Sequence, residues 1–210
     1  MKKWFKTWLA ASLVVASPLV FAAQETREVP EFKAIRSEGA YKLVVNVGKP
    51  QSVVLSADED VLARLATKVV GEELVISMPE VKNYKYSDKV TITIDVPTLT
   101  KFQMEGAGTS TLNNLSGERF QMNSQGVGRV AANGKVQNLV MRMEGVGSVN
   151  TRDVDAQNVD VKLEGVGSAK VRASESLNAR VDGIGSLTYY GNPPKVTKRV
   201  DGIGSVRAGD

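Results

Sequence analysis

The sequence predicts an all-β protein that folds as a parallel β-helix, a solenoid with about 19 residues per turn and one short helix near its N-terminal end. Three observations predict this fold. A Gly-x-Gly motif returns six times in the second half of the chain, the motifs are evenly spaced, and apolar residues alternate with polar ones before each motif. Self-similarity at a fixed period is typical of an architecture in which each unit stacks on the next.

The repeated motif is a pair of glycines separated by one residue. The intervals between successive first glycines are 20, 19, 20, 18 and 19 residues. Each pair is expected to form a corner, where a left-handed conformation or a close backbone approach excludes a Cβ atom. The predicted structural corners are Gly106 and Gly108, Gly126 and Gly128, Gly145 and Gly147, Gly165 and Gly167, Gly183 and Gly185, and Gly202 and Gly204.

The segments before the motifs have the pattern of half-buried strands. Apolar residues alternate there, as in Phe102 and Met104 or in Val159, Val161 and Leu163, and this two-residue period indicates one buried face. About 19 residues at roughly 3.3 Å each, less the corners, suit one turn with two or three short strands. Successive turns would stack about 4.8 Å apart, so that equivalent residues of the regular repeats at 102–210 form columns along the axis.

Residues 31–101 have the same strand character without the glycine repeat. The segment 58–66 predicts the one helix of the mature chain, with acidic residues in its first turn. We expect residues 31–101 to form the first, larger turns of the same solenoid, with the helix capping that end, so that 24–210 is a single domain. At the other end we expect an open C-terminal edge that a second copy could cover, giving a homo-oligomer. The predicted strands in this half are 32–35, 41–47, 52–55, 73–78 and 89–96.

The first 23 residues are predicted to be a secretory signal peptide. Three lysines precede an apolar stretch at 9–20, and small residues around Ala22 offer a cleavage site. No later segment is apolar enough to span a bilayer as a helix. We therefore expect an exported protein, located first of all in the periplasm, with the cell surface or secretion as alternatives.

Composition narrows the functions that the mature chain can have. The whole chain has 27 basic and 23 acidic residues, and the signal peptide contains three of the lysines and no acid. The mature chain is therefore nearly neutral, and its bulk charge does not predict nucleic-acid binding. The chain has no cysteine, so it has no disulfide, and no histidine, which restricts catalysis. We predict no cofactor and no catalytic residue.

An acidic residue precedes the glycine pair in five of the six turns. A column of stacked carboxylates could bind a line of calcium ions. Basic residues two positions earlier offer a simpler partner, because adjacent acidic and basic columns form a solvated ion-pair ladder. We favour the ladder and predict no metal site. The acidic column is Glu105, Glu144, Glu164, Asp182 and Asp201, and the basic column is Arg142, Lys162, Arg180 and Arg199.

Tyrosines are the candidate binding residues. Tyr84 and Tyr86 lie in a polar segment at 79–87, and Tyr189 and Tyr190 precede a Gly-Asn-Pro-Pro turn. A tyrosine ring with its polar tip suits contacts with sugars or proteins. We expect Tyr189 to face the core, which leaves Tyr84, Tyr86 and Tyr190 as the predicted binding residues.

Several motifs together resemble a known family of exported bacterial proteins. They are the Phe-Lys-Ala-Ile at 32–35, the Leu-Val-Ile-Ser at 74–77, the Val-Pro-Thr-Leu at 96–99, the recurring Gly-Val-Gly-Ser and the Tyr-Gly-Asn-Pro-Pro at 190–194. From about residue 30 onward the chain is similar to the head GIN domain family, whose members are described as auto-transporter adhesin heads. The resemblance implies a right-handed parallel β-helix and supplies no catalytic residues.

These observations predict a non-catalytic binding or surface-structural module. A solenoid has long flat faces that suit an extended partner such as a polysaccharide or an envelope protein. Two alternatives remain open: an enzyme of the polysaccharide-lyase type, which shares the β-helix architecture, and an envelope scaffold that binds only itself or a partner protein.

Overall fold

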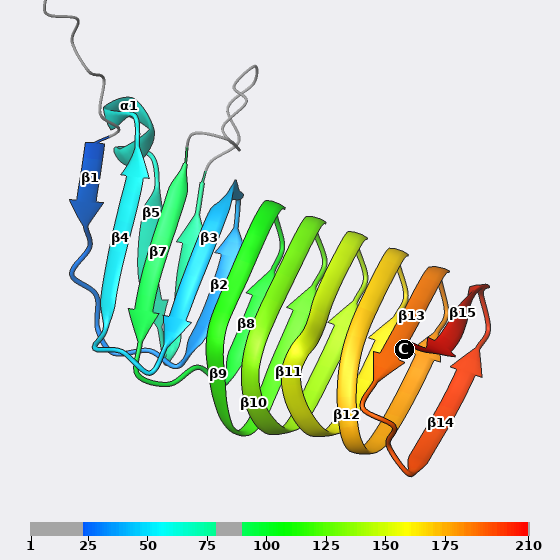
Figure 1. The fold of residues 1–210 in the computed structure, drawn as a ribbon. Helices are drawn as coiled ribbons and strands as arrows, with labels where there is room; N and C mark the ends of the chain where they lie inside the picture. The colour runs from blue at the N-terminus through cyan, green and yellow to red at the C-terminus, as the bar shows by residue number, and fades with distance from the viewer. Residues whose placement is uncertain (1–22, 79–89, 210) are drawn as a thin grey trace, which may run out of the picture.

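The computed structural model describes residues 23–78 and 90–209, and almost all of its regular structure is β-strand (Figure 1). Within these residues all the strands belong to one continuous 15-stranded sheet, and the single helix is α1 (Glu59–Leu62). In the N-terminal part the strands are β1 (Ala23–Thr26), β2 (Ala34–Glu38), β3 (Ala40–Val47), β4 (Ser52–Ala57), β5 (Ala66–Val70), β6 (Glu73–Ser77) and β7 (Thr91–Val96). They are followed by β8 (Lys101–Met104), β9 (Ala107–Ser124), β10 (Val127–Met143), β11 (Val146–Leu163), β12 (Val166–Val181), β13 (Ile184–Tyr190), β14 (Lys195–Val200) and β15 (Ile203–Ala208).

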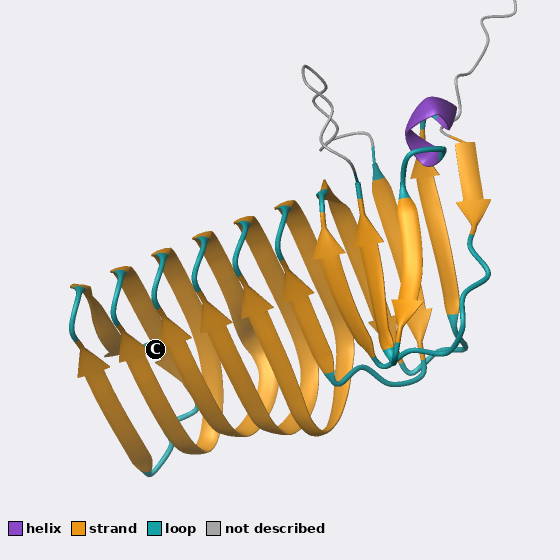
Figure 2. Ribbon diagram, turned by 180° about the vertical axis from the view of Figure 1, so that it is seen from behind, coloured by secondary structure: helices purple, strands orange, loops and turns teal. Residues whose placement is uncertain are grey.

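The regular half is a parallel β-solenoid, as the sequence predicts. Each long strand begins at a corner, runs down one face, bends round and returns up the other face to the next corner (Figures 1 and 2). Neighbouring layers are parallel and in register at the corners, where Gly128 of β10 is paired with Gly108 of β9 and with Gly147 of β11. Residues one repeat apart therefore stack in columns.

The interior of the solenoid is made of stacked apolar columns. One column loses side-chain volume towards the C-terminus, and every member of it is at most 1% exposed. Burial of such side chains stabilises the fold by about 1.5–3 kcal/mol each, which one isolated turn could not accumulate against the entropy of ordering its backbone. The column consists of Phe102, Met122, Met141, Val161 and Ala179.

The N-terminal half is built differently from the expectation of successive solenoid turns. The layer formed by β2 and β3 lies between the layer of β8 and β9 and the layer of β6 and β7, although β6 and β7 come later in the sequence. Three further strands are antiparallel: β4 pairs with β7, β5 with β6, and β1 with β4. The short connection between β5 and β6 favours their antiparallel pairing, because parallel neighbours need a long crossover.

The helix is shorter than the 58–66 that the sequence predicts. It is a single turn, and Ala66 already begins β5, which forms a hairpin with β6 through a turn at Gly71 (φ 62°). This pairing requires residues 66–70 to be extended, which overrides the local helical preference. The helix lies at the N-terminal end of the solenoid, where Val61 and Leu62 are buried (Figure 1).

Candidate interaction surface

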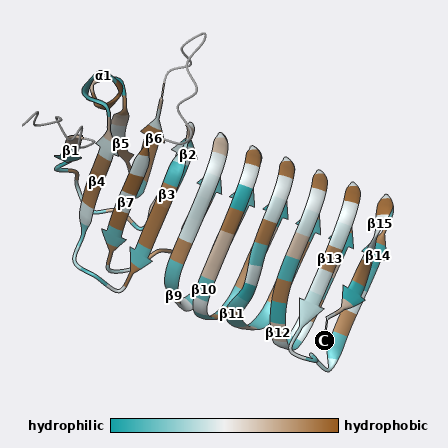
Figure 3. Ribbon diagram, turned by 45° about the horizontal axis from the view of Figure 1, so that its top comes forward, coloured by the Kyte–Doolittle hydropathy of each residue, from teal (hydrophilic) through white to brown (hydrophobic). Residues whose placement is uncertain are grey.

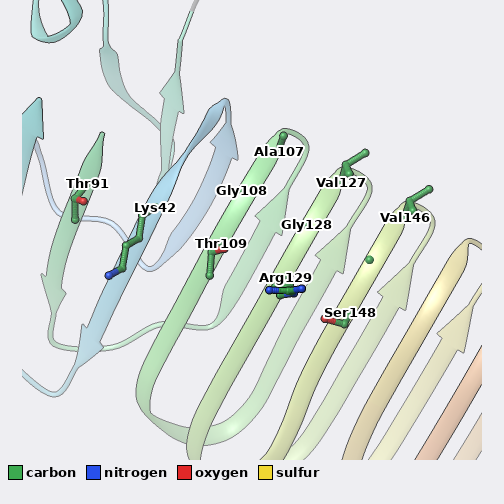
Figure 4. Close-up of a pocket in the computed structure, with 11 residues that line it drawn as sticks. Lys42, Thr91, Ala107, Gly108, Thr109, Val127, Gly128, Arg129, Val146 and Ser148 are labelled. Carbon is green, nitrogen blue, oxygen red and sulfur yellow. The ribbon is translucent and has the colours of Figure 1, made fainter. Parts of the chain in front are cut away.

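A line of exposed aliphatic side chains runs along the corners of the solenoid. The residue between the two glycines of each motif points outward, and these residues are paired from layer to layer. The five large members are 47–76% exposed. Figure 3 shows the hydrophobic colour at the starts of the successive layers, and Figure 4 shows three of the side chains side by side. We call this line the aliphatic row: Ala107, Val127, Val146, Val166, Ile184 and Ile203.

The glycines on either side of the aliphatic row are required by the close approach of neighbouring layers. A Cβ atom built at Gly126 would lie 1.7 Å from the carbonyl oxygen of Gly106 in the layer before it. At the second glycine of the motif, a Cβ atom at Gly167 would lie 1.9 Å from the carbonyl oxygen of Gly147. Such distances cannot be relieved by side-chain movement, because the atom that is met belongs to the backbone. Glycine at these positions therefore keeps the aliphatic row in register.

A shallow open groove follows the second glycine column next to the aliphatic row. Between Thr91 and Ser148 it has a volume of about 920 Å³. Its floor is glycine, one wall is aliphatic, and the other wall is polar (Figure 4). The polar wall contains Lys42, Thr109, Arg129 and Ser148, which are register neighbours in four successive layers. The groove thus offers an apolar side and a side of hydrogen-bond donors to one extended molecule.

On the other side of the aliphatic row the acidic and basic columns pair as the sequence predicts in the last layers. Lys162 Nζ is 2.7 Å from Glu164 and 3.7 Å from Asp182, and Arg180 Nε is 2.8 Å from Asp182. The ladder continues through Arg180 to Asp201, which also pairs with Arg199. Among the described residues, no group of three or more acidic side chains could hold a metal ion.

The ladder shifts the pKa values of its central pair. The hydrogen bond to Asp182 raises the pKa of the Arg180 guanidinium, and the same hydrogen bond lowers the pKa of the Asp182 carboxyl. Both groups are accessible to water, so the pair contributes little to stability. In the part of the chain that the structure describes, the ladder gives each acidic residue of the column from Glu164 onward a basic partner.

The predicted tyrosines are not brought together. Tyr84 and Tyr86 lie outside the described residues. Tyr190 is partly buried, and the guanidinium of Arg152 lies 4.4 Å from the centre of its ring. Tyr189 occupies an inward position and packs against the core, with Lys198 Nζ 4.6 Å from its ring centre. In the described part of the chain, the tyrosines near the C-terminus therefore each have a cation over one ring face.

Two features of the structure were not predicted from the sequence. A ladder of amides joins four successive layers: Asn46 donates to Asp95 at 2.7 Å, Asn113 donates to Asn46 at 3.0 Å, and Asn133 donates to Asn113 at 2.9 Å. The asparagines at 113 and 133 are one repeat apart, which is the signal that could have revealed part of the ladder. Their partners at 46 and 95 lie outside the repeat.

The second missed feature is a seventh corner at Gly39. A Cβ atom at Gly106 would lie 2.0 Å from the carbonyl oxygen of Gly39, so the first glycine column begins one layer earlier than the motif. Tyr41 occupies the position of the second glycine. Burial raises the pKa of Tyr41 well above its ordinary value, and its hydroxyl accepts from Ser37 and donates to the Ile76 carbonyl.

The C-terminal end of the solenoid has two edge strands. β14 pairs with β12 alone and β15 with β13 alone, so one side of each is unpaired within the described residues. Val196, Val200 and Ile203 are exposed there. Residues 23–78 and 90–209 contain no helix with the length and apolarity that crossing a bilayer requires.

Comparison with solved structures supports the fold. A putative adhesin from Bacteroides fragilis matches with a TM-score of 0.72 and 22% identity, covering 91% of this chain and 98% of that one. A putative lipid binding protein from Parabacteroides distasonis matches with a TM-score of 0.52 and 16% identity, and a putative adhesin from Parabacteroides merdae with 0.51 and 15%. Both cover 91% of this chain and 98% of their own.

Comparison with protein families identifies the chain more directly. No curated protein matches the sequence. The family model described as "Putative auto-transporter adhesin, head GIN domain" matches residues 31–193, which include the N-terminal layers and five of the six glycine corners. The chain therefore belongs to the head GIN domain family.

Proposed function

We propose that this protein is an exported, non-catalytic binding module of the adhesin type, which holds an extended partner along its aliphatic row. The observation that carries the proposal is the row itself: large aliphatic side chains, each about half exposed or more, aligned in consecutive layers. A contiguous exposed apolar strip rimmed by polar residues is typical of an interaction site. Six layers about 4.8 Å apart give a strip about 24 Å long, which suits a polysaccharide or a protein segment.

The experiment compares substitutions within the row with the same substitution elsewhere. Val146→Glu and Val166→Glu place charges in the middle of the row, while Val70→Glu, at an equally exposed valine on β5, is the matched control. The purified proteins are assayed on immobilised glycans and in pull-downs of envelope proteins. We expect the row variants to lose a binding partner that the wild type and Val70→Glu retain. Equal binding by all four proteins would contradict the proposal.

We also propose that a second copy attaches at the C-terminal edge. The support is the unpaired side of β14 and of β15, because exposed strand edges are templates for further pairing. Sedimentation velocity over a range of concentrations should show a mass that rises with concentration. A monomer at every concentration would count against this second contact.

Export is proposed through cleavage of residues 1–23 as a signal peptide, with the periplasm as the first destination. Membership in an adhesin family supports an exported or surface protein. Cell fractionation followed by N-terminal sequencing of the recovered protein should find the chain beginning at Ala23 or Gln24. A cytoplasmic protein that retains Met1 would contradict this.

The rival is an enzyme of the polysaccharide-lyase type. Such an enzyme needs a carboxylate cluster around a metal and an unpaired base, whereas the acidic column pairs with its basic neighbours at Lys162 and Arg180. A lyase assay with calcium and pectin-like substrates separates the two proposals. We expect no turnover; activity that disappears in Glu144→Gln or Glu164→Gln would favour the enzyme.

A further inference from the structure

The face on the groove side of the aliphatic row differs in charge from the other flank. Its first two outward columns contain hydroxyl, amide and basic side chains, with Val44 and Ala131 as aliphatic members, and no acid. We call the basic members of these columns the basic strip: Lys42, Arg129, Lys170 and Arg207.

The four members of the basic strip recur with a fixed period along the axis. They lie on β3, β10, β12 and β15, and one layer separates each from the next, namely β9, β11 and β13. With about 4.8 Å per layer, one positive charge appears about every 9.6 Å. Between Arg129 and Lys170 the basic strip shifts from the first outward column to the second, which lies two residues further along the strand. Neutral hydrogen-bonding side chains such as Thr109 and Ser148 occupy the layers between.

The basic strip is available to a partner. All four side chains are exposed, and within residues 23–78 and 90–209 none of them has a carboxylate partner. Three basic residues of the opposite flank differ in this respect, because Lys162, Arg180 and Arg199 are held by acidic neighbours. The strip therefore presents uncompensated positive charge beside an apolar row.

We infer that the basic strip binds a linear anionic polysaccharide that carries one negative charge for every two sugar residues. In an extended β-linked chain a disaccharide spans close to two layers of the solenoid, so each acidic sugar would meet one basic side chain. The hydroxyl-bearing layers would meet the neutral sugars, and the aliphatic row would contact C–H groups along one edge of the chain. This inference names the partner of the proposed binding module and rests on that function.

Other polyanions fit this surface less well. Each strand of duplex DNA has one phosphate about every 3.4 Å along the helix axis, far more densely than the basic side chains, and single strands bind on aromatic platforms that the strip lacks. An anionic bilayer would also meet the acidic column on the far side of the aliphatic row, including Glu144 and Glu164. The charge pattern therefore favours a chain that lies on one flank alone.

The test uses a polysaccharide in which uronic acid and neutral sugars alternate, with polygalacturonate, a neutral glucan, single-stranded DNA and anionic vesicles as competitors. Binding to the purified protein is measured by calorimetry at about 50 and about 200 mM salt, since screening should weaken the interaction. Arg129→Gln and Lys170→Gln remove charges from the strip. Arg142→Gln removes an exposed charge from the opposite flank and is the matched control.

We expect the alternating polysaccharide to bind best, with each strip substitution weakening it about five- to tenfold and the control changing it less than about twofold. Thermal unfolding of each variant verifies that the fold is intact. Absence of binding by the folded wild type, an equal loss in Arg142→Gln, or tighter binding of DNA or vesicles would overturn the inference. If in that case Val166→Glu still abolishes binding of another partner, the proposed function stands without the polysaccharide.

Discussion

Gly145 lies directly against Gly126 of the preceding layer, so closely that a methyl group added at Gly145 would be 1.9 Å from the Gly126 carbonyl oxygen. The same relationship recurs at each corner and is the reason that the corners stack. It makes the glycine a packing requirement, because Gly145 has no left-handed backbone angle.

Replacing Gly145 by alanine should destabilise the fold severely. The layers at this corner would have to separate, and we expect a loss of more than about 3 kcal/mol in the free energy of unfolding. Gly117→Ala is the control, because Gly117 has φ 130° and open space around it, so that only backbone strain of about 1–2 kcal/mol is expected. Urea unfolding followed by circular dichroism measures both. Equal losses would show that the close approach is not what requires glycine.

The carboxylate of Glu73 should make stability depend on pH. Burial disfavours its charged form, but hydrogen bonds from Arg36 and Lys101 outweigh burial and lower its pKa below the ordinary 4.5. A lowered pKa in the folded state means that the stabilisation is complete above pH 4.5 and is lost as the pH falls through the folded value. We expect Glu73→Gln to cost about 1–2 kcal/mol at neutral pH and less in acid.

Unfolding measured from neutral pH to about pH 3 tests this dependence. Glu175→Gln, at an exposed position on β12, is the matched control and should leave the acid part of the curve unchanged. A Glu73→Gln protein that loses as much stability in acid as the wild type would refute the role of this carboxylate.

The amide ladder should contribute more to stability than the ion-pair ladder. Asn113 is half-buried and both donates and accepts within the amide ladder, so Asn113→Ala should cost about 1–2 kcal/mol. Arg180 is 43% exposed, and Arg180→Ala should cost less than Asn113→Ala, with the loss shrinking in high salt. The free energy of unfolding of both variants, measured at low and at high salt, tests this ranking. A larger, salt-dependent effect at Arg180 would reverse the ranking.

The repeating half could be predicted from the sequence because the residues that define each turn lie close together in the chain. A glycine pair every 18–20 residues and the alternation before it define the corner, the strand and the inward side chains together. The prediction was wrong where strands that are far apart in the sequence pair with one another. Nothing near β6 or β7 indicates that they lie outside β2 and β3, and Gly39 could not be recognised as a corner because Tyr41 replaces its second glycine.

The same limit applies to the surface. The ion pairs of the acidic and basic columns were predictable because their members are two residues apart on one strand. The aliphatic row consists of the central residues of the same motifs. Its exposure could not be predicted, because the sequence does not show that the residue between the two glycines points outward. The amide ladder joins Asn46 and Asp95 of the irregular half to the repeat, and no sequence period connects them.

Tyr190 is predicted to act through its ring in the folded protein and through its hydroxyl in binding. The guanidinium of Arg152 lies over the ring, so Tyr190→Ala should cost about 1–2 kcal/mol, whereas Tyr190→Phe should leave stability within about 0.5 kcal/mol. If Tyr190 is a binding residue, Tyr190→Phe will weaken binding of the partner at unchanged stability. Unchanged affinity in Tyr190→Phe would restrict this residue to packing.

Distances between spin labels along the aliphatic row test the stacked corners most directly. The chain has no cysteine, so labels can be attached at Ala107→Cys paired with Ile184→Cys or with Ile203→Cys. These pairs are separated by four and five layers, which predicts about 19 Å and about 24 Å between backbone positions. An increase of about 4.8 Å from the first pair to the second would support the account. Distances that do not increase from the first pair to the second, or that place either pair far beyond these values, would contradict it.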